Sequence, residues 1–286
     1  MHRLACRAEV IGVSRSAPPL LRREGPRQIA CDLRDARAVR ELLDRVRPDA
    51  VVTTHALSDV DRCEQAPDEA RAQNVDTVCV VADGLGASSV PWIHLSTDYV
   101  FDGTKGSAYV ESDPPNPLGV YGRSKREGEL IVLGRPCSLV VRTSTLFGEG
   151  RANFCDYVAG RLLAEEPVEA FHDQRTSPTY TKDLAAGIDA VLGALAHASD
   201  PLPARIVHMA NDGGCSRVAF AQRIADLLRR PRALIRAIPM AAQQRPAPRP
   251  TCSILTTEQL PQLIGERLRP WDDALDAYLR DRHWIN

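Results

Sequence analysis

The sequence predicts an α/β protein with a Rossmann-like, doubly wound parallel sheet and a smaller C-terminal α/β subdomain. Two observations predict this class. Short apolar runs that fit buried strands alternate with segments whose apolar residues recur at helical spacing. One of these runs ends directly in hydroxyl and acidic residues, at the position where open α/β sheets bind ligands. We expect residues 1–150 to form the main sheet domain and residues 151–286 to form mainly a second subdomain, interleaved with the first.

The strand and helix signals follow one another along the chain. Apolar runs bounded by polar residues predict strands at 9–13, 28–31, 50–54, 90–95 and 137–143. Apolar residues at helical spacing predict helices that end before Pro48, that span about 67–85, that contain Tyr121, that follow 177–179, and that include 271–279. Residues 243–250 form a proline-rich loop.

Composition and charge exclude several classes of protein. A chain of 286 residues is long enough to bury a large core, and a formal net charge of −1 argues against a nucleic-acid surface. No apolar run approaches the length of a membrane span or of a signal-peptide core. The 8 cysteines form no Cys-x-x-Cys pair, so we assign no metal site. These features predict a cytoplasmic protein with reduced cysteines.

Tyr121 and Lys125 are the most informative pair in the sequence. They lie four residues apart, so on a helix they occupy the same face, one turn from each other. A lysine ammonium in that position favours the phenolate and is expected to lower the pKa of the tyrosine. Such a phenol can exchange a proton with a carbonyl or alcohol oxygen. The alternative is a chance pairing of two residues with no joint chemistry.

A hydroxyl group precedes this pair at the end of the predicted strand at 90–95. The strand runs into Ser96-Thr97-Asp98-Tyr99. Thr97 is therefore placed to hydrogen-bond the same substrate oxygen that Tyr121 protonates. The alternative for Thr97 is a hydroxyl that only caps the start of a helix.

These motifs and several others resemble one known family. The resemblance rests on Ser96-Thr97-Asp98-Tyr99-Val100-Phe101-Asp102-Gly103, Pro117 to Lys125, Arg142-Thr143-Ser144, Asn153-Phe154, Asp173 to Thr179, and Arg249-Pro250 with Ser253 and Leu255. Together they resemble extended short-chain dehydrogenase/reductases, and most closely the dTDP-4-dehydrorhamnose reductase family. The resemblance implies NAD(P)H-dependent reduction of a 4-keto sugar nucleotide, with Thr97, Tyr121 and Lys125 as the catalytic triad.

The cofactor preference follows from the resemblance and from charge. Arg15 comes just after the predicted strand at 9–13, where the adenosine ribose is expected, and an arginine there accommodates a 2′-phosphate. We therefore predict NADPH, with NADH as the alternative if Arg15 is only a surface arginine. The remaining cofactor contacts are expected from Asp32, Leu33, His55, Ser96, Tyr121 and Lys125.

The substrate side is predicted from separated segments. The resemblance implies that the loop ending in Asn153 and Phe154 faces the sugar nucleotide. Arg175 and Arg249 could bind a diphosphate, because guanidinium groups match phosphate oxygens; the alternative is a surface or salt-bridge role for each. The complete set of expected substrate contacts is Thr97, Asp98, Tyr99, Asn153, Phe154, Arg175 and Arg249.

One feature departs from the family pattern. Family members begin with a strand and a glycine-rich phosphate loop, whereas here the run at 9–13 already resembles the second strand and residues 1–8 resemble the end of the first helix. The similar string Gly84-Leu85-Gly86 is expected to cap a helix. Loss of the central first strand would leave two neighbouring strands without a partner. An incomplete start is the favoured explanation, and a degenerate paralogue is the alternative.

Two other functions were weighed. A sugar-nucleotide dehydratase would show Thr-Asp-Glu, but this chain has Thr97-Asp98-Tyr99 and so lacks the second carboxylate. A non-catalytic regulatory subunit on the same fold, like the β subunit of methionine adenosyltransferase, is favoured by the absent phosphate loop and opposed by the intact triad. A nucleotide sugar is the expected partner, and a homodimer is compatible with these features.

Overall fold

The structure is a computed structural model that describes residues 8–16, 27–197 and 204–286. Its main sheet has four parallel strands in the order β10-β5-β4-β3. The strands are β3 (Val51–Thr53), β4 (Trp92–Thr97), β5 (Ser138–Thr143) and β10 (Ile206–His208). This parallel sheet between helices confirms the predicted α/β, Rossmann-like class.

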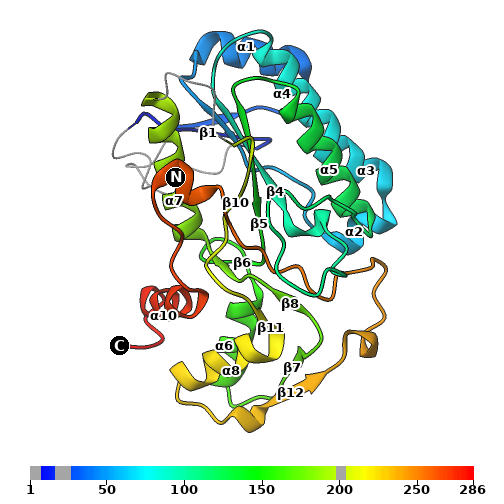
Figure 1. The fold of residues 1–286 in the computed structure, drawn as a ribbon, viewed down its shortest axis with the longest axis vertical. Helices are drawn as coiled ribbons and strands as arrows, with labels where there is room; N and C mark the ends of the chain where they lie inside the picture. Colours follow the sequence, from blue (N-terminus) through cyan, green and yellow to red (C-terminus); the bar gives the residue numbers. More distant parts are fainter. Residues whose placement is uncertain (1–7, 17–26, 198–203) are drawn as a thin grey trace.

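Helices cover both faces of the main sheet (Figure 1). One face carries α1 (Ala36–Val46), α2 (Val60–Gln65), α3 (Pro67–Arg71), the π-helical turn η2 (Ala72–Asp76), α4 (Thr77–Leu85) and α5 (Val120–Leu133). The other carries α7 (Thr181–His197) and α9 (Leu260–Ile264). Strand side chains alternate between the faces: Trp92 and Val140 pack in the cluster with α4 and α5, and Ile93 packs with α7.

The starts of four helices are set by local side chains. Asp35, Asp59, Asn153 and Ser216 each have extended backbone angles, and each side-chain oxygen accepts a backbone N–H from the first turn of its helix. At the other end of α4, Gly86 adopts φ 52° and its N–H donates to the carbonyl of Ala82. The predicted role of Gly84-Leu85-Gly86 as a helix cap therefore fits the structure.

The first two strands of the described chain form a separate parallel pair, β1 (Ile11–Ser14) and β2 (Arg27–Ala30). Each differs by one or two residues from the predicted run. No strand ladder joins this pair to β3 within the described ranges. The segment at 1–8 that resembles the end of a helix lies, apart from Ala8, outside the described residues.

The remaining elements gather below the main sheet in Figure 1. Three short strand pairs are β6 (Leu146–Phe147) with β9 (Thr179–Tyr180), β7 (Val168–Phe171) with β12 (Ile235–Ile238), and β8 (Arg175–Thr176) with β11 (Cys215–Ser216). Their helices are α6 (Phe154–Leu163), α8 (Arg217–Leu227), α10 (Trp271–Asp281), and the short 3-10 turns η3 (Asp98–Val100), η4 (Arg232–Leu234) and η5 (Met240–Ala242). Stacked and tilted rings of Phe147, Tyr180 and Tyr278 lie in the core of this region.

The two parts of the chain are interleaved in space. Strand β10 and helices α7 and α9 come from the second half of the sequence but pack into the main sheet. The division of the chain into two parts at residue 150 stays a prediction. None of the described helices is both long enough and apolar enough to span a membrane.

Candidate active site

The candidate site lies where the carboxyl end of β4 meets the first turn of α5. Helix α5 approaches the turn η3 closely because residue 122 is glycine: a Cβ there would lie 2.1 Å from the carbonyl oxygen of Tyr99. This close approach brings Tyr121, on the first turn of α5, next to Tyr99. Their rings meet edge to face, with centroids 5.7 Å apart.

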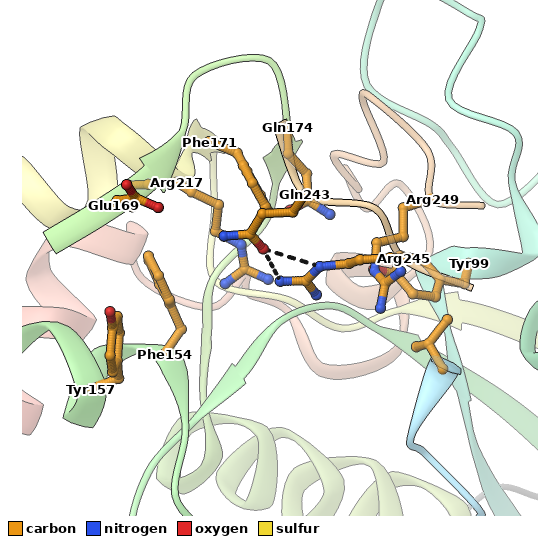
Figure 2. A pocket seen from close by; sticks show the side chains of 12 residues that line it. Tyr99, Phe154, Tyr157, Glu169, Phe171, Gln174, Arg217, Gln243, Arg245 and Arg249 are labelled. Carbon is orange, nitrogen blue, oxygen red and sulfur yellow. Dashed lines mark hydrogen bonds between the residues drawn. The ribbon is translucent and has the colours of Figure 1, made fainter. Parts of the chain in front are cut away.

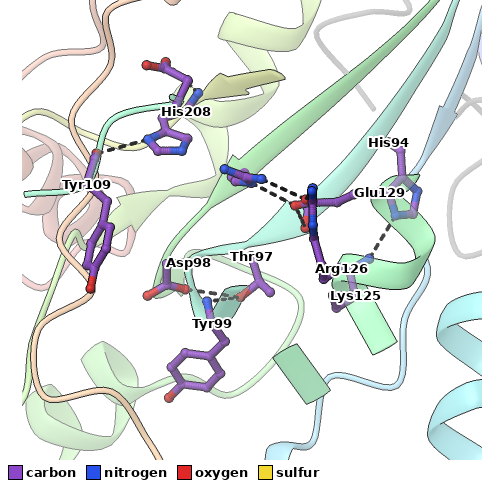
Figure 3. Close-up of polar contacts among 12 residues, drawn as sticks. His94, Thr97, Asp98, Tyr99, Tyr109, Lys125, Arg126, Glu129 and His208 are labelled. Atoms are coloured by element: carbon purple, nitrogen blue, oxygen red, sulfur yellow. Dashed lines mark hydrogen bonds and ion pairs between the residues drawn. The ribbon is translucent and has the colours of Figure 1, made fainter. Parts of the chain in front are cut away.

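Thr97 occupies the junction between strand and turn (Figure 3). Its hydroxyl accepts the backbone N–H of Tyr99 at 3.2 Å and donates to Asp98 Oδ1 at 3.2 Å. Thr97 therefore caps the 3-10 turn η3, which is the alternative role that the sequence allowed for this hydroxyl. Its side chain also interacts with the Tyr121 hydroxyl. The two groups predicted to share one substrate oxygen are thus brought together.

The expected tuning of Tyr121 by Lys125 is not what the structure shows. Burial raises the pKa of Tyr121 above its ordinary value, and the Thr97 side chain offsets this only in part. Lys125 is not among the groups that act most strongly on the pKa of Tyr121, and its ammonium is held by the Leu95 carbonyl oxygen and His94 Nε2. Tyr121 therefore keeps its proton, which suits a proton donor.

Lys125 is almost fully buried, at 2 % exposure, and its partners are neutral. Its Nζ donates to the carbonyl oxygen of Leu95 at 2.7 Å and contacts His94 Nε2 at 3.1 Å (Figure 3). Burial lowers the pKa of Lys125 to about 8, while the nearby Glu129 charge acts in the opposite direction. The ammonium is therefore close to losing its proton near physiological pH.

Asp98 supports the site from within the protein. Its carboxylate accepts hydrogen bonds from Ser144 and Ser253, which come from distant parts of the sequence, as well as from Thr97. Burial raises the pKa of Asp98 against these hydrogen bonds. These three hydroxyls hold the Asp98 carboxylate in place, and its predicted contact with the substrate stays a prediction.

A cavity of about 550 Å³ opens beside Tyr99 (Figure 2). Its lining combines aromatic and basic side chains: Val60, Tyr99, Phe154, Tyr157, Glu169, Ala170, Phe171, Gln174, Arg217, Gln243, Arg245 and Arg249. Of the predicted substrate contacts, Tyr99, Phe154 and Arg249 line this cavity. Aromatic walls and guanidinium groups suit a ligand with a planar ring and an anionic part.

The three arginines of the cavity differ in how their charge is balanced. Arg249 makes a bidentate ion pair with Asp61, at 3.0 and 2.8 Å. Arg245 donates to the Gln243 side chain, a neutral acceptor. Arg217 lies over the Phe154 ring, 4.9 Å from its centroid, and makes no ion pair within the described ranges. Burial lowers the pKa of Arg217, so an anion in the cavity would relieve an uncompensated charge.

Two predicted substrate contacts lie elsewhere. Arg175 is exposed on β8 and does not line the cavity. Asn153 caps α6, where its Oδ1 accepts Asp156 N–H and its amide donates to the Gly148 carbonyl oxygen. Local hydrogen bonds account for the position of the Asn153 side chain, and the predicted substrate contacts of both residues stay predictions.

The predicted cofactor contacts are spread along the sheet edge. Arg15 is exposed after β1, and Asp32 pairs on the surface with Arg34 at 2.6 Å. Leu33 packs against the small cluster under α1. His55 Nε2 contacts Thr77 Oγ1 at 2.5 Å, and burial lowers the pKa of His55 to about 4, helped by the Lys125 charge.

The Ser96 side chain points into the core, and the predicted contact of this residue with the cofactor stays a prediction. The Ser96 hydroxyl donates to Glu129 Oε1 at 2.6 Å and lies in the core. Strand alternation explains this: Ser96 and Thr97 are neighbours on β4, so their side chains point to opposite faces of the sheet.

Sequence reasoning missed four residues that complete the site: His94, Thr53, Asn74 and Arg217. His94 precedes Ser96 by two residues on β4, and a histidine within an apolar strand was a usable signal. Asn74, in the π-helical turn η2, donates to the Leu57 carbonyl oxygen and to Ser124 Oγ and accepts Leu57 N–H, which ties the loop after β3 to α5. Arg217 gave no signal in so arginine-rich a chain.

Comparisons with known proteins give a consistent result. The family model described as RmlD substrate binding domain matches residues 3–283. A dTDP-4-dehydrorhamnose reductase of Streptomyces griseus is 37 % identical over 92 % of this chain and 88 % of its own. The spore coat polysaccharide biosynthesis protein SpsK of Bacillus subtilis is 34 % identical over 88 % of this chain and 86 % of its own. The solved dTDP-4-dehydrorhamnose reductase of Bacillus anthracis, in complex with NADP, has a TM-score of 0.80 and 25 % identity, with 89 % of each chain covered.

Proposed function

This chain belongs to the RmlD substrate binding domain family, and we propose that it is an NADPH-dependent oxidoreductase that reduces the 4-keto group of a dTDP-4-keto-6-deoxy sugar. One observation carries the proposal. Tyr99 lines the basic, aromatic cavity and also contacts the ring of Tyr121. A sugar nucleotide held in the cavity would therefore present its sugar ring to the proton donor.

Each residue of the triad has a separate task in this proposal. Tyr121, kept protonated by its raised pKa, gives its proton to the sugar O4. The Thr97 hydroxyl lies beside it and polarises the same oxygen. Lys125 lies one turn after Tyr121 on α5 and helps to position the reacting groups. Its ammonium gives up a proton readily, because burial lowers its pKa to about 8. Positioning these three groups is the main contribution of the protein.

The described residues fit the nicotinamide end of NADPH. Lys125 has three N–H groups, and two of them have acceptors in the described structure. The third remains for a ribose hydroxyl. When bound there, NADPH supplies the hydride that reduces the sugar carbon. At the adenosine end, the exposed Arg15 supports a 2′-phosphate, and the solved relative that carries NADP supports the same choice.

The cavity supports a nucleoside diphosphate as the anchoring part of the substrate. Phe154 and Tyr157 offer rings for a base, and Arg217 and Arg245 offer guanidinium groups for the diphosphate. The names of the relatives support thymidine as the nucleoside. Cytoplasmic location and a homodimer belong to the same proposal as expectations from sequence.

Turnover tests the proposal directly. The full chain is incubated with NADPH and enzymatically generated dTDP-4-keto-6-deoxyglucose or its epimer, and the loss of NADPH absorbance is followed while the product is identified by mass spectrometry. We expect stoichiometric formation of the alcohol, and turnover lower by about two to four orders of magnitude in the Tyr121→Phe variant. Binding of NADPH without turnover of any keto-sugar nucleotide would instead favour the non-catalytic, regulatory alternative.

A further inference from the structure

We infer that His94 is a positioning residue for Lys125: its neutral imidazole, fixed by Thr53 and Trp92, presents an unprotonated Nε2 that holds the lysine ammonium in place. The inference rests on the proposed function for its catalytic meaning, but the geometry stands without it. It assigns a task to a histidine that lies outside the predicted triad.

The side chains of Trp92, Thr53, His94 and Lys125 form a continuous chain of hydrogen bonds between the main sheet and α5. Trp92 Nε1 donates to Thr53 Oγ1 at 2.9 Å. The same oxygen lies 2.8 Å from His94 Nδ1, and His94 Nε2 lies 3.1 Å from Lys125 Nζ. Trp92 and His94 are both 0 % exposed. Because the chain is anchored on two adjacent strands, the imidazole cannot turn without breaking it.

Hydrogen-bond chemistry fixes the tautomer when Lys125 is charged. An ammonium group only donates, so His94 Nε2 must accept. A neutral imidazole then carries its proton on Nδ1, which faces Thr53 Oγ1. That oxygen can accept both this N–H and the indole N–H of Trp92. Every contact in the chain is therefore consistent with one tautomer.

The surrounding charges keep His94 neutral. Burial first, and then the positive charge of Lys125, hold the pKa of His94 well below its usual range; His55 acts in the same direction. Glu129, one turn further along α5, attracts the ammonium but pairs with Arg142. Tyr121, one turn before, is the remaining ionisable group on this face of α5. Nε2 and the Leu95 carbonyl oxygen are thus the neutral acceptors that position the ammonium.

Lysine titration tests the inference without relying on turnover. The chain has only three lysines, Lys105, Lys125 and Lys182, and the other two form ion pairs with Asp113 and Asp281. With isotope-labelled lysine, the Nζ titration of each can be followed by NMR in the full chain and assigned with Lys125→Met. In His94→Leu, which removes the acceptor, the Lys125 midpoint should fall by about one pH unit. In His94→Gln, whose side-chain oxygen can replace Nε2, it should stay near the wild-type value.

Two further variants keep the test decisive. Thr53→Val removes the oxygen that holds Nδ1–H and should also lower the Lys125 midpoint, even if His94→Leu does not fold. His208→Gln removes another buried histidine, which contacts Tyr109 and Thr256 instead, and should leave Lys125 unchanged. An unchanged Lys125 midpoint in both Thr53→Val and His94→Leu overturns the inference, as does an equal shift in His208→Gln.

Turnover with NADPH then tests whether the contact between His94 and Lys125 affects catalysis. The alkaline limb of the kcat profile should move with the Lys125 midpoint in each variant, and His94→Gln should restore it. If the wild-type chain reduces no keto-sugar nucleotide, the proposed function fails while the titration still decides the role of His94.

Discussion

Two buried charges on helix α5 have opposite surroundings. Lys125 and Glu129 lie four residues apart, at 2 % and 0 % exposure. Glu129 accepts a bidentate pair from Arg142, at 2.9 Å for each bond, and further hydrogen bonds from Ser96 and Arg126. Lys125 has only neutral acceptors.

The pKa values of the two groups follow this difference. Burial alone would raise the pKa of Glu129, but Arg142 holds it below the usual value, so the group stays charged. Burial lowers the pKa of Lys125 to about 8, because the charge of Glu129, which is itself paired with Arg142, offsets the lost hydration only in part. The ion-paired carboxylate of Glu129 stabilises the fold, whereas the ammonium of Lys125, which has no ion-pair partner, can lose its proton more easily. Glu129 is therefore expected to act in the stability of the fold and Lys125 in catalysis.

The largest expected effect comes from Tyr121→Phe, which removes the proton donor one turn before Lys125. Turnover should fall by about two to four orders of magnitude, because general-acid catalysis is lost while packing is kept. NADPH affinity and the circular dichroism spectrum should change little. Near-normal turnover in this variant would remove Tyr121 from the mechanism.

Glu129→Gln tests the ion-paired carboxylate. It leaves the Arg142 guanidinium buried without its partner, so the free energy of unfolding should fall by about 3–5 kcal/mol. Urea denaturation followed by circular dichroism measures the change. Ser96→Ala, which removes one hydrogen bond to the same carboxylate, is the matched control and should cost about 1 kcal/mol. Equal losses in the two variants would contradict a structural ion pair.

Lys125→Met should change the free energy of unfolding in the direction opposite to that of Glu129→Gln. Removing a buried, unpaired ammonium should raise the free energy of unfolding at neutral pH by about 1–3 kcal/mol while turnover is lost. Since the folded pKa, about 8, lies below the ordinary value of 10.5, the cost of burying the ammonium is complete below pH 8 and diminishes as pH rises towards 10.5. The stability advantage of the variant should therefore shrink across that range. A lower free energy of unfolding in Lys125→Met would contradict the conclusion that the buried ammonium of Lys125 destabilises the fold.

The smallest expected effect extends the contrast to the cavity. Arg217 makes no ion pair among the described residues and faces the cavity, so Arg217→Met should raise KM for the sugar nucleotide by about tenfold, the worth of one charged hydrogen bond. Arg175→Met is the control, because Arg175 is exposed outside the cavity. Equal KM values for the two variants would exclude Arg217 from substrate binding.

The sequence predicted the fold class and the grouping of the proposed triad because these depend on local patterns. Apolar runs located β3, β4 and β5 to within two residues, and the helix predicted to contain Tyr121 is α5. Spacing also put Tyr121 and Lys125 on neighbouring turns of one helix. The pKa of Tyr121 depends mainly on how deeply the fold buries its phenol, which local spacing does not reveal, so the sequence predicted that shift with the wrong sign.

The sequence by itself determined which helices and strands form. It also determined that β4 ends in the polar residues Ser96 and Thr97 and is followed by Asp98. Both follow from neighbours within a few positions of the chain. Tertiary structure alone decided that Lys125 turns to His94, that Ser96 turns to Glu129, and that Arg217 enters the cavity while Arg175 stays outside. Burial and hydrogen-bond partners set these outcomes. Both arise only when β3, β4 and α5 pack together and when the segments around Arg217 and Arg249 close over Tyr99.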